Sequence, residues 1–136
     1  MMKRKLLIAI MVLTSNHFFA QETQFENSVF YINVFINQNN DVWVESDLIE
    51  FSNIKDEVKS IIYNHPFKLD EKIVYRVFAD QNLPLGDIVE VEQELFQAYN
   101  DDAKRERYLL DIVTMNIDGS NWFQKVDDLK LKKSKV

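Results

Sequence analysis

The sequence predicts an α+β fold in which a single mixed sheet of four or five strands carries two helices on one face. Stretches rich in β-branched and aromatic residues alternate with two amphipathic stretches at helical spacing, and no repeat or Gly/Ser linker interrupts them. A length of 136 residues suffices for one domain with its own core. We expect the element order β-β-α-β-α-β-(β).

The N-terminal residues have the pattern of a secretory signal peptide. Basic residues at positions 3–5 precede an apolar run that becomes polar before Ala20. A bilayer-spanning helix needs about 20 mostly apolar residues, and this stretch reaches Ala20 only by including four polar positions. We therefore expect residues 1–20 to be removed on export to the periplasm, leaving residues 21–28 as a short linker. The alternative is an uncleaved anchor in the inner membrane, formed by residues 6–20.

The folded domain is expected to span residues 29–126 and to begin with a hairpin. Residues 29–36 (VFYINVFI) and 42–46 (VWVES) are rich in β-branched and aromatic side chains, which favour strands. Residues 38–41 (QNND) have turn chemistry. The two strands should therefore pair in antiparallel fashion.

Two amphipathic stretches predict the helices. Residues 52–65 carry apolar side chains at i, i+4, i+7 and i+8 and stop before Pro66. Residues 85–99 carry a second, mixed stripe that includes Glu92 among apolar side chains. The stretch 72–79 (KIVYRVFA) between them is a predicted strand, and strand-helix-strand units favour parallel neighbours.

The C-terminal part of the domain is predicted to close with a second hairpin. Residues 105–117 hold a strand, Asp118 and Gly119 are typical of a hairpin turn, and residues 121–126 (NWFQKV) can form the returning strand. Residues 127–136 form a charged tail.

Two helices cannot cover both faces of such a sheet, so one face should stay uncovered. Because successive strand residues point to opposite faces, part of this face can be named from the sequence. The residues expected there, which form a candidate interface, are Tyr31, Phe35, Arg76 and Phe78. By the same alternation, Tyr108, Leu110 and Ile112 should face the helices. Apolar side chains on the open face are either scattered, as on most surfaces, or form a homodimer or partner site; the two faces can also be assigned the other way round.

Charge and composition disfavour several classes of function. The chain has 16 Lys and Arg against 22 Asp and Glu, and three of the basic residues precede position 21, so the expected mature chain has a net charge of −9. Such a charge argues against nucleic acid or an anionic membrane surface as the main partner. The absence of cysteine rules out disulfides, a thiol nucleophile, a cysteine metal site and a lipid-modified cysteine.

No catalytic constellation is evident in the sequence. The two histidines are His17, in the expected signal peptide, and His65, next to a predicted helix end, so no histidine pair is available for zinc or general-base chemistry. Acidic pairs such as Glu90 with Glu94 are explained by solvated helix faces. We therefore expect no catalytic residue, no cofactor, no metal and no enzymatic activity.

The stretch FADQNLPLGDIVEVEQELF begins as a strand and ends as a helix. In the corner between them, Asp80 can accept N–H groups of the loop, Pro84 fixes φ near the start of the helix, and Gly86 permits close packing. No His, Lys or Ser is placed to act with Asp80. The corner is therefore predicted to be a structural turn.

This corner, preceded by a hairpin and a helix in matching order, resembles the periplasmic domain of the ExbD/TolR family of biopolymer transport proteins over residues 29–117. In that family a strand ends in Ala-Asp, and a loop with proline and glycine leads into a valine-rich helix. The residues at those places are Ala79, Asp80, Pro84 and Gly86. The resemblance implies a periplasmic module that works with ExbB/TolQ channel subunits and TonB- or TolA-type partners in transport driven by the proton-motive force.

Several departures limit what the resemblance implies. Family members carry a proton on an acidic residue within a transmembrane helix, whereas residues 6–20 contain no Asp or Glu. Gln81 replaces the usual lysine, residues 100–107 form a longer loop, and residues 21–28 are short for the family's linker. We therefore expect a divergent exported relative that does not itself carry protons.

The expected function is that of a non-enzymatic interaction module that dimerises or adds an extended partner peptide to a sheet edge. Its partner would be a cell-envelope protein of the channel-subunit or TonB/TolA type, or a second copy, with membrane contact only through an uncleaved anchor. One alternative is a membrane-anchored accessory subunit of an ExbB/ExbD-type complex. Another is a small-ligand binder or enzyme, which would need a deep polar pocket.

Overall fold

The computed structural model describes residues 28–128. The expected signal peptide or anchor, almost all of the linker and residues 129–136 of the expected tail lie outside this range. The elements are β1 (Val29–Ile36), β2 (Val42–Val44), β3 (Asp47–Ile49), the 3₁₀ helix η1 (Phe51–Asn53), α2 (Ile54–Asn64), β4 (Lys72–Asp80), α3 (Leu85–Ala98), β5 (Lys104–Leu110) and α4 (Trp122–Asp128). Within the described residues, no helix has the length and hydropathy needed to cross a bilayer.

The chain divides into two compact units. The larger unit, residues 30–66 and 72 onward, holds all the helices of residues 28–128 and nearly all of the sheet. Residues 67–71 belong to the smaller unit, where the backbone N–H of Lys68 donates to Glu71 Oε2 over 3.0 Å. The following description concerns the larger unit.

The strands form one mixed sheet in the order β3-β2-β1-β4-β5. β1 with β2 and β2 with β3 are antiparallel, whereas β4 and β5 are parallel. The parallel pair is joined by α3, as expected for a strand-helix-strand unit. The predicted α+β fold with a single mixed sheet is therefore confirmed. The fifth strand is β3, a short strand that the sequence did not predict, and not the expected strand near the C-terminus.

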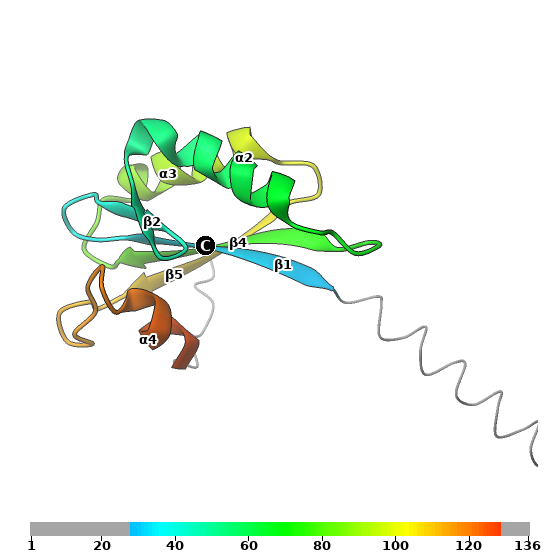
Figure 1. Cartoon of the computed structure of the whole chain (residues 1–136). Coiled ribbons are helices and arrows are strands. Elements are labelled where there is room, and N and C mark those ends of the chain that lie inside the picture. Colours follow the sequence, from blue (N-terminus) through cyan, green and yellow to red (C-terminus); the bar gives the residue numbers. More distant parts are fainter. Residues whose placement is uncertain (1–27, 129–136) are drawn as a thin grey trace, which may run out of the picture. The chain divides into compact units, whose positions relative to one another are not determined.

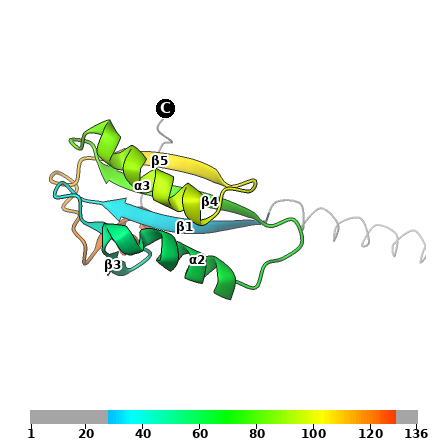
Figure 2. The same cartoon turned by 90° about the horizontal axis from the view of Figure 1, so that it is seen from above.

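Helices α2 and α3 lie on one face of the sheet, side by side (Figures 1 and 2). Their buried side chains pack on every second residue of β1 and β4, and the side chains of helices and strands together form one hydrophobic cluster. The largest members of this cluster are Ile32, Ile36, Ile54, Tyr75, Ile88 and Leu95. The face predicted for the alternate residues of β1 and β4 is thus correct. Tyr75 is also held at its polar end, because its hydroxyl donates to the carbonyl of Tyr99 over 2.7 Å.

The opposite face is partly covered by α4, which lies on the other side of the sheet in Figure 1. The expectation of a wholly uncovered face is therefore wrong. Trp122, at the start of α4, is 1% exposed, and its ring lies 5.4 Å from that of Phe35 and 6.1 Å from that of Phe78. Truncating a side chain as large and as buried as Trp122 costs about 3–5 kcal/mol. Trp122, Phe35 and Phe78 belong to a second hydrophobic cluster, which lies beneath α4 and is part of the core.

The segment predicted as a returning strand, residues 121–126, is helical from Trp122 onward. Asp118 Oδ1 accepts the backbone N–H of Asn121 (3.1 Å), and Asn121 Oδ1 accepts that of Asp118 (2.8 Å). This reciprocal pair is the arrangement of a capping box, which starts a helix. Asp118 and Gly119 do lie in a turn, but the turn leads into α4 and not into a hairpin strand.

The faces predicted for the last strand are reversed. Tyr108, Leu110 and Ile112 belong to the cluster beneath α4, not to the one beneath α2 and α3. On the side of α3, β5 presents Arg105 and Arg107, which pair with Glu92. Aromatic stacking of Tyr108 on Phe78 of β4, with centroids 5.0 Å apart, fixes this orientation.

Candidate functional site

The corner after β4 is a turn held by Asp80, which is 1% exposed. Its Oδ1 accepts the N–H of Asn82 over 3.0 Å, and its carbonyl accepts the N–H of Leu83 over 3.1 Å. Its second carboxyl oxygen is buried and has no hydrogen-bond partner among the described residues. Ala79 beside it is fully buried. None of the pockets described below is lined by Asp80.

The role expected of Gly86 is not what the structure shows. A Cβ built on Gly86 would have no atom within 4 Å, and Gly86 does not have a positive φ, so neither close packing nor backbone geometry requires glycine there. Pro84 does occupy the N-cap position of α3, with φ −56°. Pro84 therefore supports the start of the helix as expected, whereas Gly86 does not serve packing.

Two of the four candidate interface residues are core residues. Phe35 is fully buried and Phe78 is 2% exposed, both in the cluster beneath α4. They do lie on the face opposite α2 and α3, as expected. Helix α4 and the loop before it cover them, because Trp122 and Val126 recur at helical spacing and not at strand spacing. Phe35 and Phe78 cannot contact a partner in this fold.

The other two candidate interface residues stay near the surface. Tyr31 is 39% exposed, and the guanidinium carbon of Arg76 lies 4.3 Å from its ring centroid. Arg76 Nε donates to Asn33 Oδ1 over 2.7 Å, and the backbone N–H of Asn33 donates to Glu45 Oε1 over 3.0 Å. This part of the face is polar, which differs from the apolar homodimer or partner patch that was one of the two alternatives for this face.

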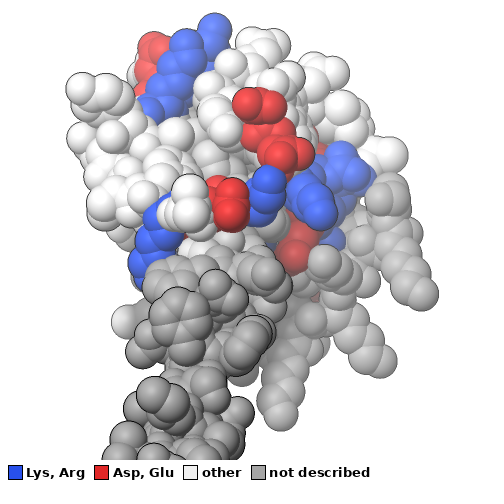
Figure 3. Space-filling view, turned by 90° about the vertical axis from the view of Figure 1, so that its right-hand side faces the viewer, with Lys and Arg blue, Asp and Glu red and all other residues white. Residues whose placement is uncertain are grey.

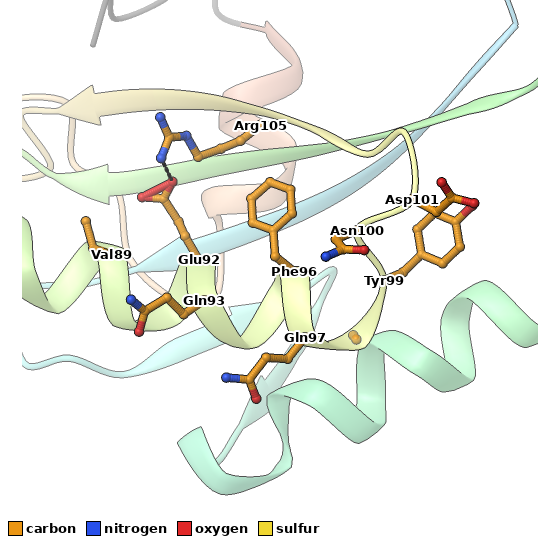
Figure 4. A pocket seen from close by; sticks show the side chains of 10 residues that line it. Val89, Glu92, Gln93, Phe96, Gln97, Tyr99, Asn100, Asp101 and Arg105 are labelled. Atoms are coloured by element: carbon orange, nitrogen blue, oxygen red, sulfur yellow. Dashed lines mark ion pairs between the residues drawn. The ribbon is translucent and has the colours of Figure 1, made fainter.

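A pocket of about 640 Å³ lies between α3 and β5 (Figure 4). In Figure 4, Glu92 and Phe96 point from α3 toward β5, and Arg105 meets Glu92 from that strand. The side chains that line the pocket include Glu92, Gln93, Phe96, Gln97, Tyr99 and Arg105. Aromatic rings and amide groups thus line the pocket together with the partly exposed guanidinium of Arg105 and the carboxylate of Asp101.

Beside this pocket Glu92 pairs with two arginines, of which Arg107 is buried and Arg105 is partly exposed. Arg107 donates to Glu92 Oε1 from Nε over 2.9 Å and also from Nη2, and the two side chains are 4% and 3% exposed. Arg105 Nη1 lies 2.8 Å from Glu92 Oε2 as an ion pair, although the contact lacks hydrogen-bond alignment. Two guanidinium groups on one carboxylate leave a net positive charge where Arg105 reaches the pocket. An electronegative group of a ligand can accept from it.

The pocket adjoins an edge of the sheet. β5 is the last strand in the sheet order, so within residues 28–128 it pairs only with β4. Arg105 is opposite Tyr75 in this pairing, and Tyr75 in turn holds the loop at Tyr99. An edge strand and a pocket for a side chain are therefore next to each other, which is the arrangement used when an extended peptide adds to a sheet.

Sequence reasoning missed this site, although a signal for it was present. Glu92 was recognised within the stripe of α3, where a charged residue is expected to be buried only with a partner. Alternate residues Arg105 and Arg107 on a neighbouring strand could supply such a partner. The reversed assignment of β5 concealed the pairing, because it placed Tyr108 and Leu110 on the side of α3.

Metal-ligating side chains are not clustered in the part of the chain that the structure describes. Residues 28–128 contain no group of three or more His, Asp or Glu side chains placed to hold a metal ion. The ring of His65 stacks on Phe30 with centroids 3.7 Å apart, at the end of α2. On the face seen in Figure 3, basic and acidic side chains lie next to one another, without an extended area of one sign. This face is not suited to nucleic acid.

Comparison with known proteins gives no family for this chain. No protein-family model matches the sequence, and no curated protein is similar enough to count as a relative.

Proposed function

We propose that this protein is a non-enzymatic interaction module that binds an extended segment of a partner protein along β5. The observation that carries the proposal is the contiguity of the β5 edge with the α3–β5 pocket at Arg105. Main-chain hydrogen bonds to the strand would supply affinity, and one partner side chain in the pocket would supply specificity. The net positive charge of the buried cluster favours a partner segment with an acidic or carbonyl-rich side chain at that position.

The resemblance to ExbD/TolR periplasmic domains suggests where such a partner belongs. We propose a cell-envelope protein of the channel-subunit or TonB/TolA type, or a second copy of this chain, met in the periplasm after export. The alternative is an accessory subunit that keeps residues 6–20 as a membrane anchor. Mass spectrometry of the protein purified from its own cells distinguishes the two, because only the first loses residues 1–20.

The binding site is tested by titrating the protein with defined peptides. Overlapping peptides from the periplasmic segments of channel-subunit and TonB/TolA-type proteins of the same cell are added while amide resonances are followed by NMR. A peptide that binds should shift resonances of β5 and of the C-terminal half of α3. Gln93→Arg, which places a long cation at the pocket lining, should abolish the shifts, whereas Gln124→Arg on exposed α4 should not.

Three outcomes would contradict the proposal. Shifts that map to another surface would remove the β5 site, and equal binding by both arginine variants would show that the pocket takes no part. If the protein binds none of these peptides and stays monomeric at high concentration, neither a cell-envelope protein nor a second copy of this chain is its partner.

A second candidate function is favoured by the pocket alone. Its volume of about 640 Å³ is within the range of small-molecule sites, roughly 300–1,000 Å³. A small carboxylate ligand that accepts from Arg105 would raise the melting temperature of the protein. Thermal shift with a library of small metabolite carboxylates tests this candidate, and the absence of any stabilising ligand counts against it.

A further inference from the structure

The opposite edge of the sheet carries an exposed apolar strand. β3 is first in the sheet order and, among the described residues, pairs only with β2. Leu48 in β3 is 63% exposed, and Phe51 just after it is 47% exposed. Exposed edges with apolar side chains promote unwanted pairing, and proteins usually cover or charge them. A further segment of this chain or of a partner is therefore expected to cover β3.

Three shallow hollows adjoin this edge and share lining residues. Those of about 460 and 420 Å³ share Leu48, Ile49 and Glu50, and the latter shares Asn40 and Phe51 with a third of about 180 Å³. The hollows thus form one continuous surface along β3 and η1, which we call the β3 surface. Its apolar centre is formed chiefly by Leu48, Ile49 and Phe51.

The β3 surface is negatively charged. The carboxylates that line its three hollows are Asp41, Glu50, Asp56, Glu57, Asp87 and Glu90. No Lys or Arg lines any of the three. A segment that covers this surface should therefore be basic and should carry no acidic residue.

The two faces of the β3 edge differ in chemistry. Leu48 is paired with Trp43, which contacts the cluster beneath α4, so Leu48 lies on the α4 face of the sheet. Asp56 and Glu57 lie in the first turn of α2, on the opposite face. A strand added beside β3 would therefore need apolar side chains on its α4 face and basic ones on its α2 face.

We propose that residues 129–136 of the same chain bind the β3 surface as an additional edge strand. Their sequence, LKLKKSKV, begins with alternating leucine and lysine, the period that separates the two faces of a strand, and contains four lysines and no acidic residue. Leu129 and Leu131 would lie on the α4 face of the sheet beside Leu48. Lys130 and Lys132 would lie on the other face, toward the carboxylates of α2.

The start of this segment lies within reach of β3. Residues 129–136 follow α4 directly, and Asp127 near the end of α4 is close enough to Glu45 to contribute to the raised pKa of that carboxyl. Glu45 is in the two-residue turn that leads into β3. Eight extended residues span up to about 26 Å, more than the roughly 17 Å from Asp47 to Phe51.

The test follows the backbone amide of Leu48. A two-residue turn makes Val44 and Asp47 a hydrogen-bonded pair, so Leu48 is in the next, non-bonded pair and its N–H points away from β2. In the full chain we expect hydrogen exchange of this amide to be slowed by the added strand. Lys130→Glu with Lys132→Glu should accelerate exchange about tenfold or more, and so should high salt, which screens the attraction. Lys68→Glu with Lys104→Glu makes the same charge change at exposed positions that line none of the three hollows, and it should leave exchange at Leu48 unchanged.

Each remaining outcome overturns the proposal. Equal exchange at Leu48 in the parent and in the Lys130/Lys132 variant would show that the segment does not cover β3. A dimer in sedimentation that is lost in this variant, with protection of Leu48 that depends on protein concentration, would assign the segment to a second copy and remove the intramolecular contact. If the Leu48 amide loses its protection equally in the Lys68/Lys104 variant, the slowed exchange depends on the overall charge of the protein and not on binding of residues 129–136.

Discussion

Arg107 of β5 and Glu92 of α3 form a buried ion pair in which Arg107 Nε and Nη2 both donate to one carboxylate oxygen, Nε over 2.9 Å. The pair joins the last strand to the helix that connects it to β4. Removing both ions from water costs free energy, and the hydrogen bonds between them offset part of this desolvation cost. It fixes the position of α3 against β5 and hence the pocket between them.

We expect Glu92→Leu to lower the free energy of unfolding by about 3–5 kcal/mol, because it leaves Arg107 buried without a partner. Urea denaturation followed by circular dichroism measures the loss. The double variant Glu92→Leu with Arg107→Leu should lose less than the sum of the two single variants. Glu90→Leu, at an exposed position of the same helix, is the control. Equal losses for the substitutions of Glu90 and Glu92 would contradict a structural role for the pair.

Substitution with glutamate separates core from surface on the α4 face. Phe78→Glu should unfold the domain, because a charge at a position 2% exposed has no partner. Tyr31→Glu, at a position 39% exposed, should leave the domain folded. Circular dichroism and sedimentation of both variants check this. A folded Phe78→Glu protein would show that α4 does not cover this residue in solution.

Asp80→Ala should lower stability by roughly 1 kcal/mol, the usual scale for losing a bond that caps a turn. Peptide binding at the α3–β5 pocket should stay unchanged, because Asp80 is buried and does not line that pocket. Denaturant unfolding and the peptide titration are carried out on the same variant. Lost binding at unchanged stability would make Asp80 a contact residue.

Alanine at the two glycines should have opposite effects on stability. A Cβ on Gly119 would overlap the indole ring of Trp43, and overpacking of this kind costs about 1–3 kcal/mol. Gly86→Ala meets no atom within 4 Å inside α3 and should stabilise by about 0.5–1 kcal/mol. Thermal denaturation of both variants gives the signs. A neutral Gly119→Ala would mean that the loop before α4 can move away from Trp43.

Glu45 should make stability depend on pH, because burial raises its pKa above the ordinary value of 4.5 against smaller opposing effects of Asn33 and Arg76. A raised pKa means that the folded state favours the protonated carboxyl. The stabilising contribution of the protonated Glu45 carboxyl to the free energy of unfolding is fully present below pH 4.5. It is lost as pH rises through the folded-state pKa.

Glu45→Gln keeps an oxygen that can accept the N–H of Asn33 but cannot ionise. The stability of this variant relative to the parent should therefore increase from pH 4 toward pH 7, as measured by denaturant unfolding at each pH. Ser46→Ala in the same turn should show no such trend. A difference between Glu45→Gln and parent that stays constant over this range would contradict the raised pKa.

Local patterns fixed the first four predicted elements because their signals are strong and independent of distant residues. The hairpin of residues 29–44 follows from β-branched runs and a turn, and α2 follows from apolar side chains at i, i+4, i+7 and i+8 before Pro66. The faces of β1 and β4 followed from alternation alone. β3 has only three residues, too few for a recognisable period.

The candidate site could be predicted only in part. Glu92 was visible as a charge within an apolar stripe, but its partners lie 13 and 15 residues further along the chain, on a strand whose side toward α3 had to be known first. The candidate interface failed at Phe35 and Phe78 for a related reason. Whether they are exposed depends on α4, more than 40 residues after either of them.

The sequence by itself determined the acidic charge, the absence of cysteine chemistry, the α+β class and most element bounds, because these depend on composition and on short periodic patterns. Only the tertiary structure decided which side of β5 faces α3, that the expected last strand is a helix from Trp122 onward, and that Glu92 is neutralised by two arginines. Each of these depends on contacts between distant segments, where the gain from burying Trp122 or pairing Glu92 exceeds the small difference between local conformations.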